Sequence, residues 1–219
     1  MYRENNIGGT KMDAQLKDMK VKVYLNALAS DAKVPGGGSA SALVGSLAAS
    51  LASMVASLVY TKVEDQALQV DMKAYAQRAE HLRLMLEGCI EEDAKMYELL
   101  MDAYHLPKDV EGRTERLQRA LKNAAAVPMK AITLSCKVID LCNELYPQVK
   151  GLKISDCGTA SVLALAAVRS AVFSVKINTY MIKDRDYADK VNKQAEELLA
   201  KYSPIAQSIF DAVDARITR

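Results

Sequence analysis

The segment from residue 66 to 104 most strongly constrains the fold, because its apolar residues recur at alternating spacings of four and three. Only a long helix places residues with this spacing on one face. All members of the stripe but one are apolar, so the pattern predicts one helix over 66–104 that buries this face. The stripe consists of Leu68, Met72, Tyr75, Ala79, Leu82, Leu86, Cys89, Asp93, Met96 and Leu100.

Asp93 occupies a position in this stripe where the pattern calls for an apolar residue. Its neighbours Glu91 and Glu92 fall off the stripe and can remain in water. Burying a carboxylate without a partner is costly or shifts its pKa. Two interpretations therefore stand: a salt bridge across the helix packing, or a catalytic carboxylate in a largely apolar pocket.

Helical periodicity extends along nearly the whole chain, and strand signals are nearly absent. We predict one all-α domain over 13–219, a single-domain bundle of about six long helices. Residues 1–12 are expected to form a flexible N-terminal extension, and they lack the apolar stretch of a secretion signal. The predicted helices are 13–31, 39–61, 66–104, 114–147, 156–182 and 185–217.

Four residues indicate where these helices begin or bend. Ser155 and Asp156 have the side chains of an N-cap pair and are predicted to open the helix that follows. Pro128 and Pro204 fall inside helical patterns. Because proline lacks a backbone N–H, we expect kinks or breaks at both positions.

Two segments carry faces of small residues. Residues 34–61 contain no charged side chain, and small residues recur there at every fourth position: Ser41, Gly45, Ala49, Ser53 and Ser57. A matching face follows later: Ala160, Ala164, Ala167, Ala171, Ser174 and Asn178. An uncharged segment of this length is compatible with a membrane span. Because the other helices have the amphipathic pattern of soluble proteins, we expect instead a tight helix pair in the core and no membrane association.

Composition excludes several classes of function. The 29 basic and 27 acidic residues leave a net charge of +2 without a basic run, which argues against a nucleic-acid partner. The four cysteines form no C-x-x-C pair, as in reduced cytosolic proteins, so a cytoplasmic location is expected. Only two histidines are present, which argues against a Ser-His-Asp triad or a histidine-rich metal site.

Residues 35–39 read Pro-Gly-Gly-Gly-Ser and directly precede the uncharged helix. Consecutive glycines allow a ligand to approach the backbone, and a helix N-terminus favours an anion. The alternative is a tight entry turn into a buried helix. The stretch is neither a Walker A loop nor a dinucleotide fingerprint, since no G-K-[ST] follows and no strand precedes it.

Two further polar residues allow two interpretations each. Asn178 ends the small-residue face of its helix, where it is either a hydrogen-bonded packing residue or a ligand of the substrate. Lys62 follows the uncharged helix, where it is either the partner of an anionic substrate group or a surface lysine.

Four stretches together resemble the folate cyclodeaminase/cyclohydrolase family, which includes the C-terminal domain of formiminotransferase-cyclodeaminase and free-standing methenyltetrahydrofolate cyclohydrolases. They are VPGGGSASALVGSLAASLASMV (34–55), EEDAKMYELLMDAYHLPKD (91–109), AAAVPMKAI (124–132) and ISDCGTA with SVKINTYMIKD (154–184). The similarity covers nearly the whole chain from about residue 13, in the family's order. The PGGGS helix and the D-A-x-x-Y segment are its most specific parts.

This resemblance implies an all-α homodimer that acts on a tetrahydrofolate derivative without a metal or cofactor. Asp93 matches the residue regarded as catalytic in the family, in agreement with the stripe argument. The residues expected to bind substrate are Pro35, Gly36, Gly37, Gly38, Ser39, Lys62, Asp156 and Asn178.

The chain departs from the family pattern at two places. Ser174 stands where the family usually has an asparagine, and Thr61 precedes Lys62 where many members have a glycine. These differences bear on substrate positioning and leave Asp93 and Asn178 unchanged.

The resemblance favours a methenyltetrahydrofolate cyclohydrolase, which hydrolyses 5,10-methenyltetrahydrofolate to 10-formyltetrahydrofolate. This sequence carries no formiminotransferase part that would deliver formimino-folate. The alternative enzyme is a formiminotetrahydrofolate cyclodeaminase, which releases ammonia and forms the methenyl compound. A third possibility is a non-catalytic helical dimer that binds folate or a partner protein.

Overall fold

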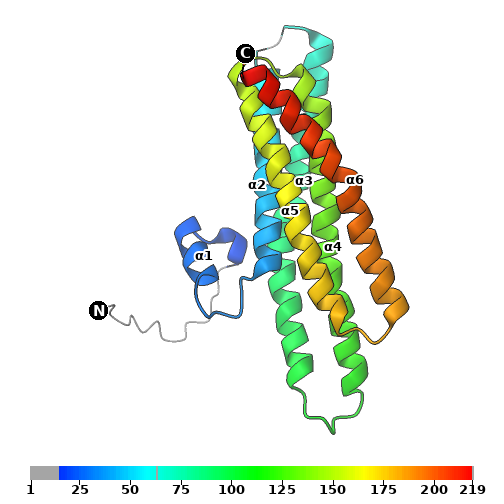
Figure 1. Cartoon of the computed structure of the whole chain (residues 1–219). Coiled ribbons are helices and arrows are strands. Elements are labelled where there is room, and N and C mark those ends of the chain that lie inside the picture. Colours follow the sequence, from blue (N-terminus) through cyan, green and yellow to red (C-terminus); the bar gives the residue numbers. More distant parts are fainter. Residues whose placement is uncertain (1–14, 63, 219) are drawn as a thin grey trace.

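A computed structural model describes residues 15–62 and 64–218 of the chain. Figure 1 shows an elongated antiparallel bundle of long helices in which successive helices run in opposite directions. The predicted extension at residues 1–12 lies outside the described residues. No strand occurs within the described part of the chain, which confirms the all-α prediction. The long helices are α2 (Gly37–Tyr60), α3 (Gln66–His105), α4 (Arg113–Leu145), α5 (Ile154–Tyr180) and α6 (Arg185–Ile217).

The N-terminal part differs from the prediction. Instead of one helix over 13–31, the described residues form a 3-10 turn, η1 (Leu16–Asp18), and a short helix, α1 (Val21–Leu28). Extended backbone at Met19, with ψ of 145°, separates them. Tyr24 is the one buried residue of α1, and Val21 is 76% exposed, so few tertiary contacts would hold this segment as one long helix. Figure 1 shows α1 beside the bundle, near the start of α2.

The start of α5 also differs from the prediction. The short 3-10 turns η2 (Tyr146–Gln148) and η3 (Gly151–Lys153) follow α4, and η3 leads directly into α5. The predicted N-cap at Ser155 and Asp156 is therefore wrong, since both residues lie inside the helix. Ser155 Oγ donates instead to the Leu152 carbonyl oxygen at 2.8 Å.

The two prolines do not break their helices. α4 continues through Pro128 and α6 continues through Pro204. Tertiary packing outweighs the local preference at Pro128, because that residue is buried in the bundle. The predicted breaks are therefore wrong.

The stripe on α3 packs into the core as predicted. Met72, Leu86 and Cys89 are fully buried. α2 packs against both α3 and α5, so the predicted pair of α2 and α5 is present. Gly45, the smallest residue of the α2 face, allows α3 and α4 to approach α2 closely. A Cβ at Gly45 would lie 2.8 Å from Ser135 Oγ of α4 and 3.0 Å from Leu86 of α3. Small residues on α2 therefore allow close approach on more than one side.

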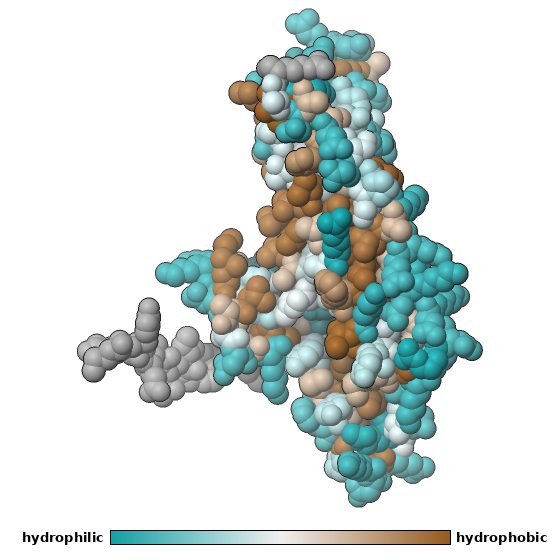
Figure 2. Space-filling view, in the orientation of Figure 1, coloured by the Kyte–Doolittle hydropathy of each residue, from teal (hydrophilic) through white to brown (hydrophobic). Residues whose placement is uncertain are grey.

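α2 and the segment Gly151–Tyr180 are long and apolar enough to cross a membrane by length and composition, a test that core helices of soluble proteins also pass. In each of these two segments, 44% of the most apolar stretch of 18 residues is buried inside the bundle. Figure 2 shows apolar side chains along the face over α2 and α5. The large exposed apolar residues of these helices include Leu47, Met54, Leu58, Val162, Phe173, Ile177 and Tyr180.

Candidate active site

A cavity of about 530 Å³ opens where α2 begins. α3 and α4 extend past the first residue of α2 (Figure 1). The residues that line the cavity come from the N-terminus of α2, from α3 and α4, and from the end of α5. The volume of the cavity is within the range of small-molecule sites, and the walls of the cavity are mostly apolar. The principal lining side chains are Lys33, Asp93, Tyr97, Leu100, Met101, Leu121, Phe173, Ser174, Ile177, Asn178, Tyr180 and Met181.

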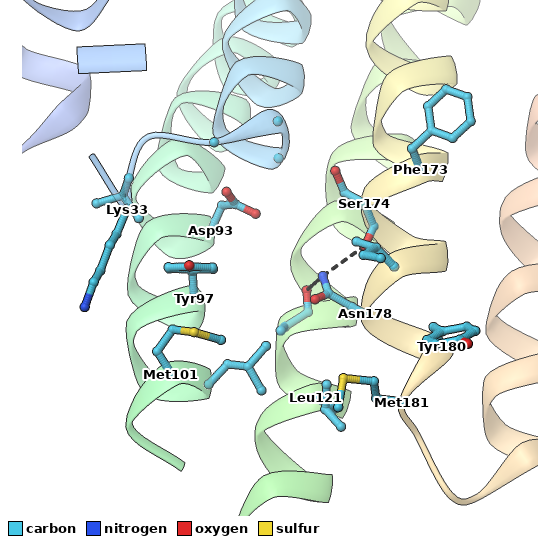
Figure 3. A pocket seen from close by; sticks show the side chains of 17 residues that line it. Lys33, Asp93, Tyr97, Met101, Leu121, Phe173, Ser174, Asn178, Tyr180 and Met181 are labelled. Carbon is cyan, nitrogen blue, oxygen red and sulfur yellow. Dashed lines mark hydrogen bonds between the residues drawn. The ribbon is translucent and has the colours of Figure 1, made fainter. Parts of the chain in front are cut away.

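Asp93 points into this cavity from α3 (Figure 3). Within the described part of the chain, no basic side chain forms an ion pair with it. Its neighbours are used differently: Glu92 pairs with Lys130 at 2.8 Å, and Glu91 accepts the Lys17 backbone N–H at 2.7 Å. Of the two interpretations of Asp93, the salt bridge is therefore wrong, and the carboxylate faces a largely apolar pocket.

Two opposing effects set the pKa of Asp93. Burial raises it above the ordinary aspartate value because a charged carboxylate loses hydration. Hydrogen bonds from Ser39 lower it, including the one from Ser39 Oγ to Asp93 Oδ2 at 3.0 Å. The net result is a raised pKa. Asp93 is thus a stronger base than an exposed aspartate.

The glycines at the start of α2 allow this carboxylate to approach the helix. A Cβ added to Gly38 would overlap the Asp93 carboxylate, whereas a Cβ at Gly36 or Gly37 would meet nothing within 4 Å. Ser39 is the third residue of α2, where the backbone N–H groups have no partner within the helix. The anion at this helix N-terminus is therefore Asp93 itself. Of residues 35–39, Gly36, Gly37 and Gly38 line the cavity, and their role in binding substrate stays a prediction. Pro35 and Ser39 are buried behind that surface.

Asn178 lies across the cavity from Asp93, near the end of α5 (Figure 3). Its Nδ2 donates to the Ala124 carbonyl oxygen at 3.1 Å and to the Ser174 carbonyl oxygen at 2.9 Å. Neither bond uses its Oδ1. Asn178 is therefore a hydrogen-bonded packing residue through its nitrogen. Its side chain also lines the cavity, and its role as a ligand of the substrate stays a prediction.

Lys62 and Asp156 are not part of this cavity. Lys62 follows the far end of α2, roughly 35 Å along the helix axis from Gly37. Asp156 lies in the first turn of α5, and Asn178 lies near its opposite end. The structure therefore does not bring these two residues together with the others in this cavity, because spacing along a helix separates them, and their role in binding substrate stays a prediction.

The structure adds pocket residues that the predicted site did not include, among them the tyrosine of the D-A-x-x-Y segment. Lys33 is the one basic side chain among the described lining residues, and Tyr97 follows Asp93 by one helical turn. The i, i+4 spacing of Asp93 and Tyr97 could have identified the tyrosine.

Tyr24 of α1 is buried, and its hydroxyl has no hydrogen-bond partner among the described residues. Burial first, and then the charges of Asp93 and Glu91, raise the pKa of Tyr24 to about 12.

Comparison with known proteins identifies relatives over nearly the full chain. The family model described as formiminotransferase-cyclodeaminase matches residues 20–197. A methenyltetrahydrofolate cyclohydrolase of Methylorubrum extorquens is 34% identical over 201 residues, which cover 90% of this chain and 97% of that protein. The formimidoyltransferase-cyclodeaminase of Rattus norvegicus is 26% identical over 93% of this chain, which spans 38% of the rat protein.

A solved structure gives the same result for the fold. The formiminotetrahydrofolate cyclodeaminase of Thermotoga maritima superposes with a TM-score of 0.84 at 27% identity. The match covers 93% of this chain and all of that one. With the family model matched over residues 20–197, these findings confirm the resemblance seen in the sequence. The chain belongs to the formiminotransferase-cyclodeaminase family.

Proposed function

We propose that the chain is a methenyltetrahydrofolate cyclohydrolase, which converts 5,10-methenyltetrahydrofolate and water to 10-formyltetrahydrofolate. The observation that carries this proposal is the carboxylate of Asp93, which faces a mostly apolar cavity and has no ion-pair partner among the described residues. The 34% identical relative that carries this name, covered over 97% of its length, supports the same activity.

The substrate itself explains why a carboxylate is needed. The carbon that bridges N5 and N10 carries a delocalised positive charge. A carboxylate beside this carbon stabilises the cation more strongly in a dry cavity than in water. The apolar walls of the cavity fit this requirement, and so does the finding that no basic side chain of the described residues forms an ion pair with Asp93.

Asp93 then acts as the base. Water attacks the bridging carbon as Asp93 takes one of its protons, which gives a neutral tetrahedral adduct. The bond between this carbon and N5 breaks, and N5 receives the proton from Asp93. The hydroxyl proton of the adduct leaves to solvent as the formyl group forms on N10. The raised pKa of Asp93 favours its role as proton acceptor.

The remaining pocket residues would position the substrate. The backbone of Gly36, Gly37 and Gly38 and the side chain of Asn178 flank Asp93 and would hold the pterin. Lys33 at the cavity would attract the glutamate carboxylates of the folate tail. We assign no metal or other cofactor to this reaction, because the substrate brings its own cation and Asp93 handles the proton.

We also propose that the chain forms a homodimer in the cytoplasm. The exposed apolar side chains over α2 and α5 form a band of the kind that subunit interfaces cover (Figure 2). The four cysteines are buried and free, which supports a reducing compartment.

The second candidate is formiminotetrahydrofolate cyclodeaminase. The Thermotoga maritima protein of that description is matched over its entire chain, so a chain without a transferase part can carry that name. In that reaction N10 attacks a formimino carbon on N5 and ammonia leaves. The same carboxylate would stabilise the same cationic product.

One spectrophotometric assay separates the candidates, because the methenyl compound absorbs in the near ultraviolet and both 10-formyl- and formiminotetrahydrofolate lack this band. A cyclohydrolase removes the band from methenyltetrahydrofolate at near-neutral pH faster than the non-enzymatic opening. A cyclodeaminase produces the band from formiminotetrahydrofolate with release of ammonia. If neither absorbance change exceeds the background rate and the chain still binds folate, both enzymatic proposals are refuted and the chain is a folate-binding protein.

A further inference from the structure

Pro128 leaves one backbone carbonyl of α4 without its helical partner. The ring nitrogen of proline carries no hydrogen, so it cannot donate to the carbonyl four residues earlier, which belongs to Ala124. Ala124 is 5% exposed and lines the cavity. Its carbonyl oxygen therefore needs another donor.

Asn178 supplies that donor from the neighbouring helix. Its Nδ2 donates at 3.1 Å to the carbonyl that Pro128 cannot reach, and at 2.9 Å to Ser174 within α5. The two hydrogens of the amide are thus both used, and this fixes which end of the side chain is nitrogen. Figure 3 shows both bonds beside the cavity.

We propose that Pro128 is a positioning residue that acts through Asn178. By withholding a backbone N–H, Pro128 reserves the Ala124 carbonyl for Asn178, and the bond holds the side chain in one orientation at the wall. Asn178 Oδ1 then remains as an acceptor for an N–H group of the ligand. This inference rests on the proposed function in one respect, that the ligand is a pterin, whose amino and ring N–H groups are donors.

Any other residue at position 128 would bring a competing donor. In Pro128→Ala the new N–H can form the ordinary helical bond to the Ala124 carbonyl, so the bond from Asn178 would become a second, weaker one and Asn178 would be held mainly by its bond to Ser174. Its side chain would then be free to change rotamer. Pro204 provides the matched control, because it also lies inside a helix, is exposed, and lies outside the cavity.

The first test is a double-mutant cycle of thermal unfolding, which needs no substrate. We expect Asn178→Ala to lower Tm by about 2–6 °C in the wild-type background, because a buried carbonyl loses its donor. In the Pro128→Ala background the same change should lower Tm by less than half as much, since the new N–H satisfies that carbonyl. Equal losses in both backgrounds would overturn the inference.

The second test is kinetic. We expect Pro128→Ala to raise the KM for methenyltetrahydrofolate roughly tenfold with kcat within about twofold, and Pro204→Ala to change neither. The double variant should be no worse than Asn178→Ala alone. A wild-type KM in Pro128→Ala would contradict the inference. A wild-type chain that turns over no methenyltetrahydrofolate would refute the proposed function, and the Tm cycle would still decide the role of Pro128.

Discussion

At the scale of single residues, the absence of a side chain at Gly38 leaves room for the Asp93 carboxylate beside the start of α2. A side chain at Gly38 would occupy the position of the Asp93 carboxylate. Gly37, its neighbour, has open space where a Cβ would lie. The two glycines are thus chemically alike but differ in what they contact.

This difference predicts unequal effects of alanine. Gly38→Ala should displace Asp93 and lower kcat about 100-fold, because small shifts of a catalytic group have large effects. Gly37→Ala should retain kcat within about threefold. Steady-state kinetics of the two purified variants, with circular dichroism to verify folding, checks the prediction. Similar kcat values for both would show that contact between Gly38 and Asp93 is unimportant.

The raised pKa of Asp93 predicts a gain in stability when its charge is removed. A group whose pKa is higher in the folded state contributes stability below its unfolded pKa, and this contribution is lost as pH rises through the folded value. At pH 7 the charged form is therefore unfavourable to folding. Asp93→Asn should have a higher Tm than the wild type at pH 7, and the difference should disappear below the ordinary value of 3.8. A lower Tm for the variant at pH 7 would contradict this.

At the scale of helices, periodicity predicted the five long elements to within a few residues because each buries one continuous stripe. It failed at α1, where only Tyr24 is buried. The break expected at Pro128 from proline chemistry is also absent, because a donor from α5 replaces the missing helical bond. Contacts between helices decide such features, and a single segment does not contain them.

The same distinction explains which site residues could be predicted. Asp93 was predictable because it interrupts the apolar stripe of its own helix. Lys62 and Asp156 were grouped with the site by motif, but motifs do not record which end of a bundle a residue occupies. Lys33 has no such signal, since it lies in a connection between α1 and α2 and reaches the cavity only through the fold.

At the scale of the whole molecule, an apolar band over α2 and α5 is exposed on the face that Figure 2 shows. Leu47 and Met54 of α2 are 48% and 40% exposed within this band. Large apolar side chains that are exposed together lower the solubility of a protein unless a partner buries them. The proposed homodimer would bury them.

A charge placed in the band should separate the subunits. We expect Leu47→Asp to elute as a monomer in size-exclusion chromatography with light scattering, while the wild type elutes as a dimer. Phe210→Asp is the control, because Phe210 is 47% exposed on α6 and lies outside the band. A wild-type monomer, or a dimer that Leu47→Asp leaves intact, would contradict the proposed interface.

The measurement that tests the central claim most directly is the decay of methenyltetrahydrofolate absorbance at near-neutral pH with Asp93→Asn beside the wild type. The neighbouring Glu92→Gln is the control, since it makes the same chemical change at a residue that pairs with Lys130 outside the cavity. After subtraction of the non-enzymatic rate, we expect Asp93→Asn to lose about 10²–10⁴-fold in kcat and Glu92→Gln to stay within about twofold. Wild-type turnover by folded Asp93→Asn would show that the unpaired carboxylate is not the catalytic group.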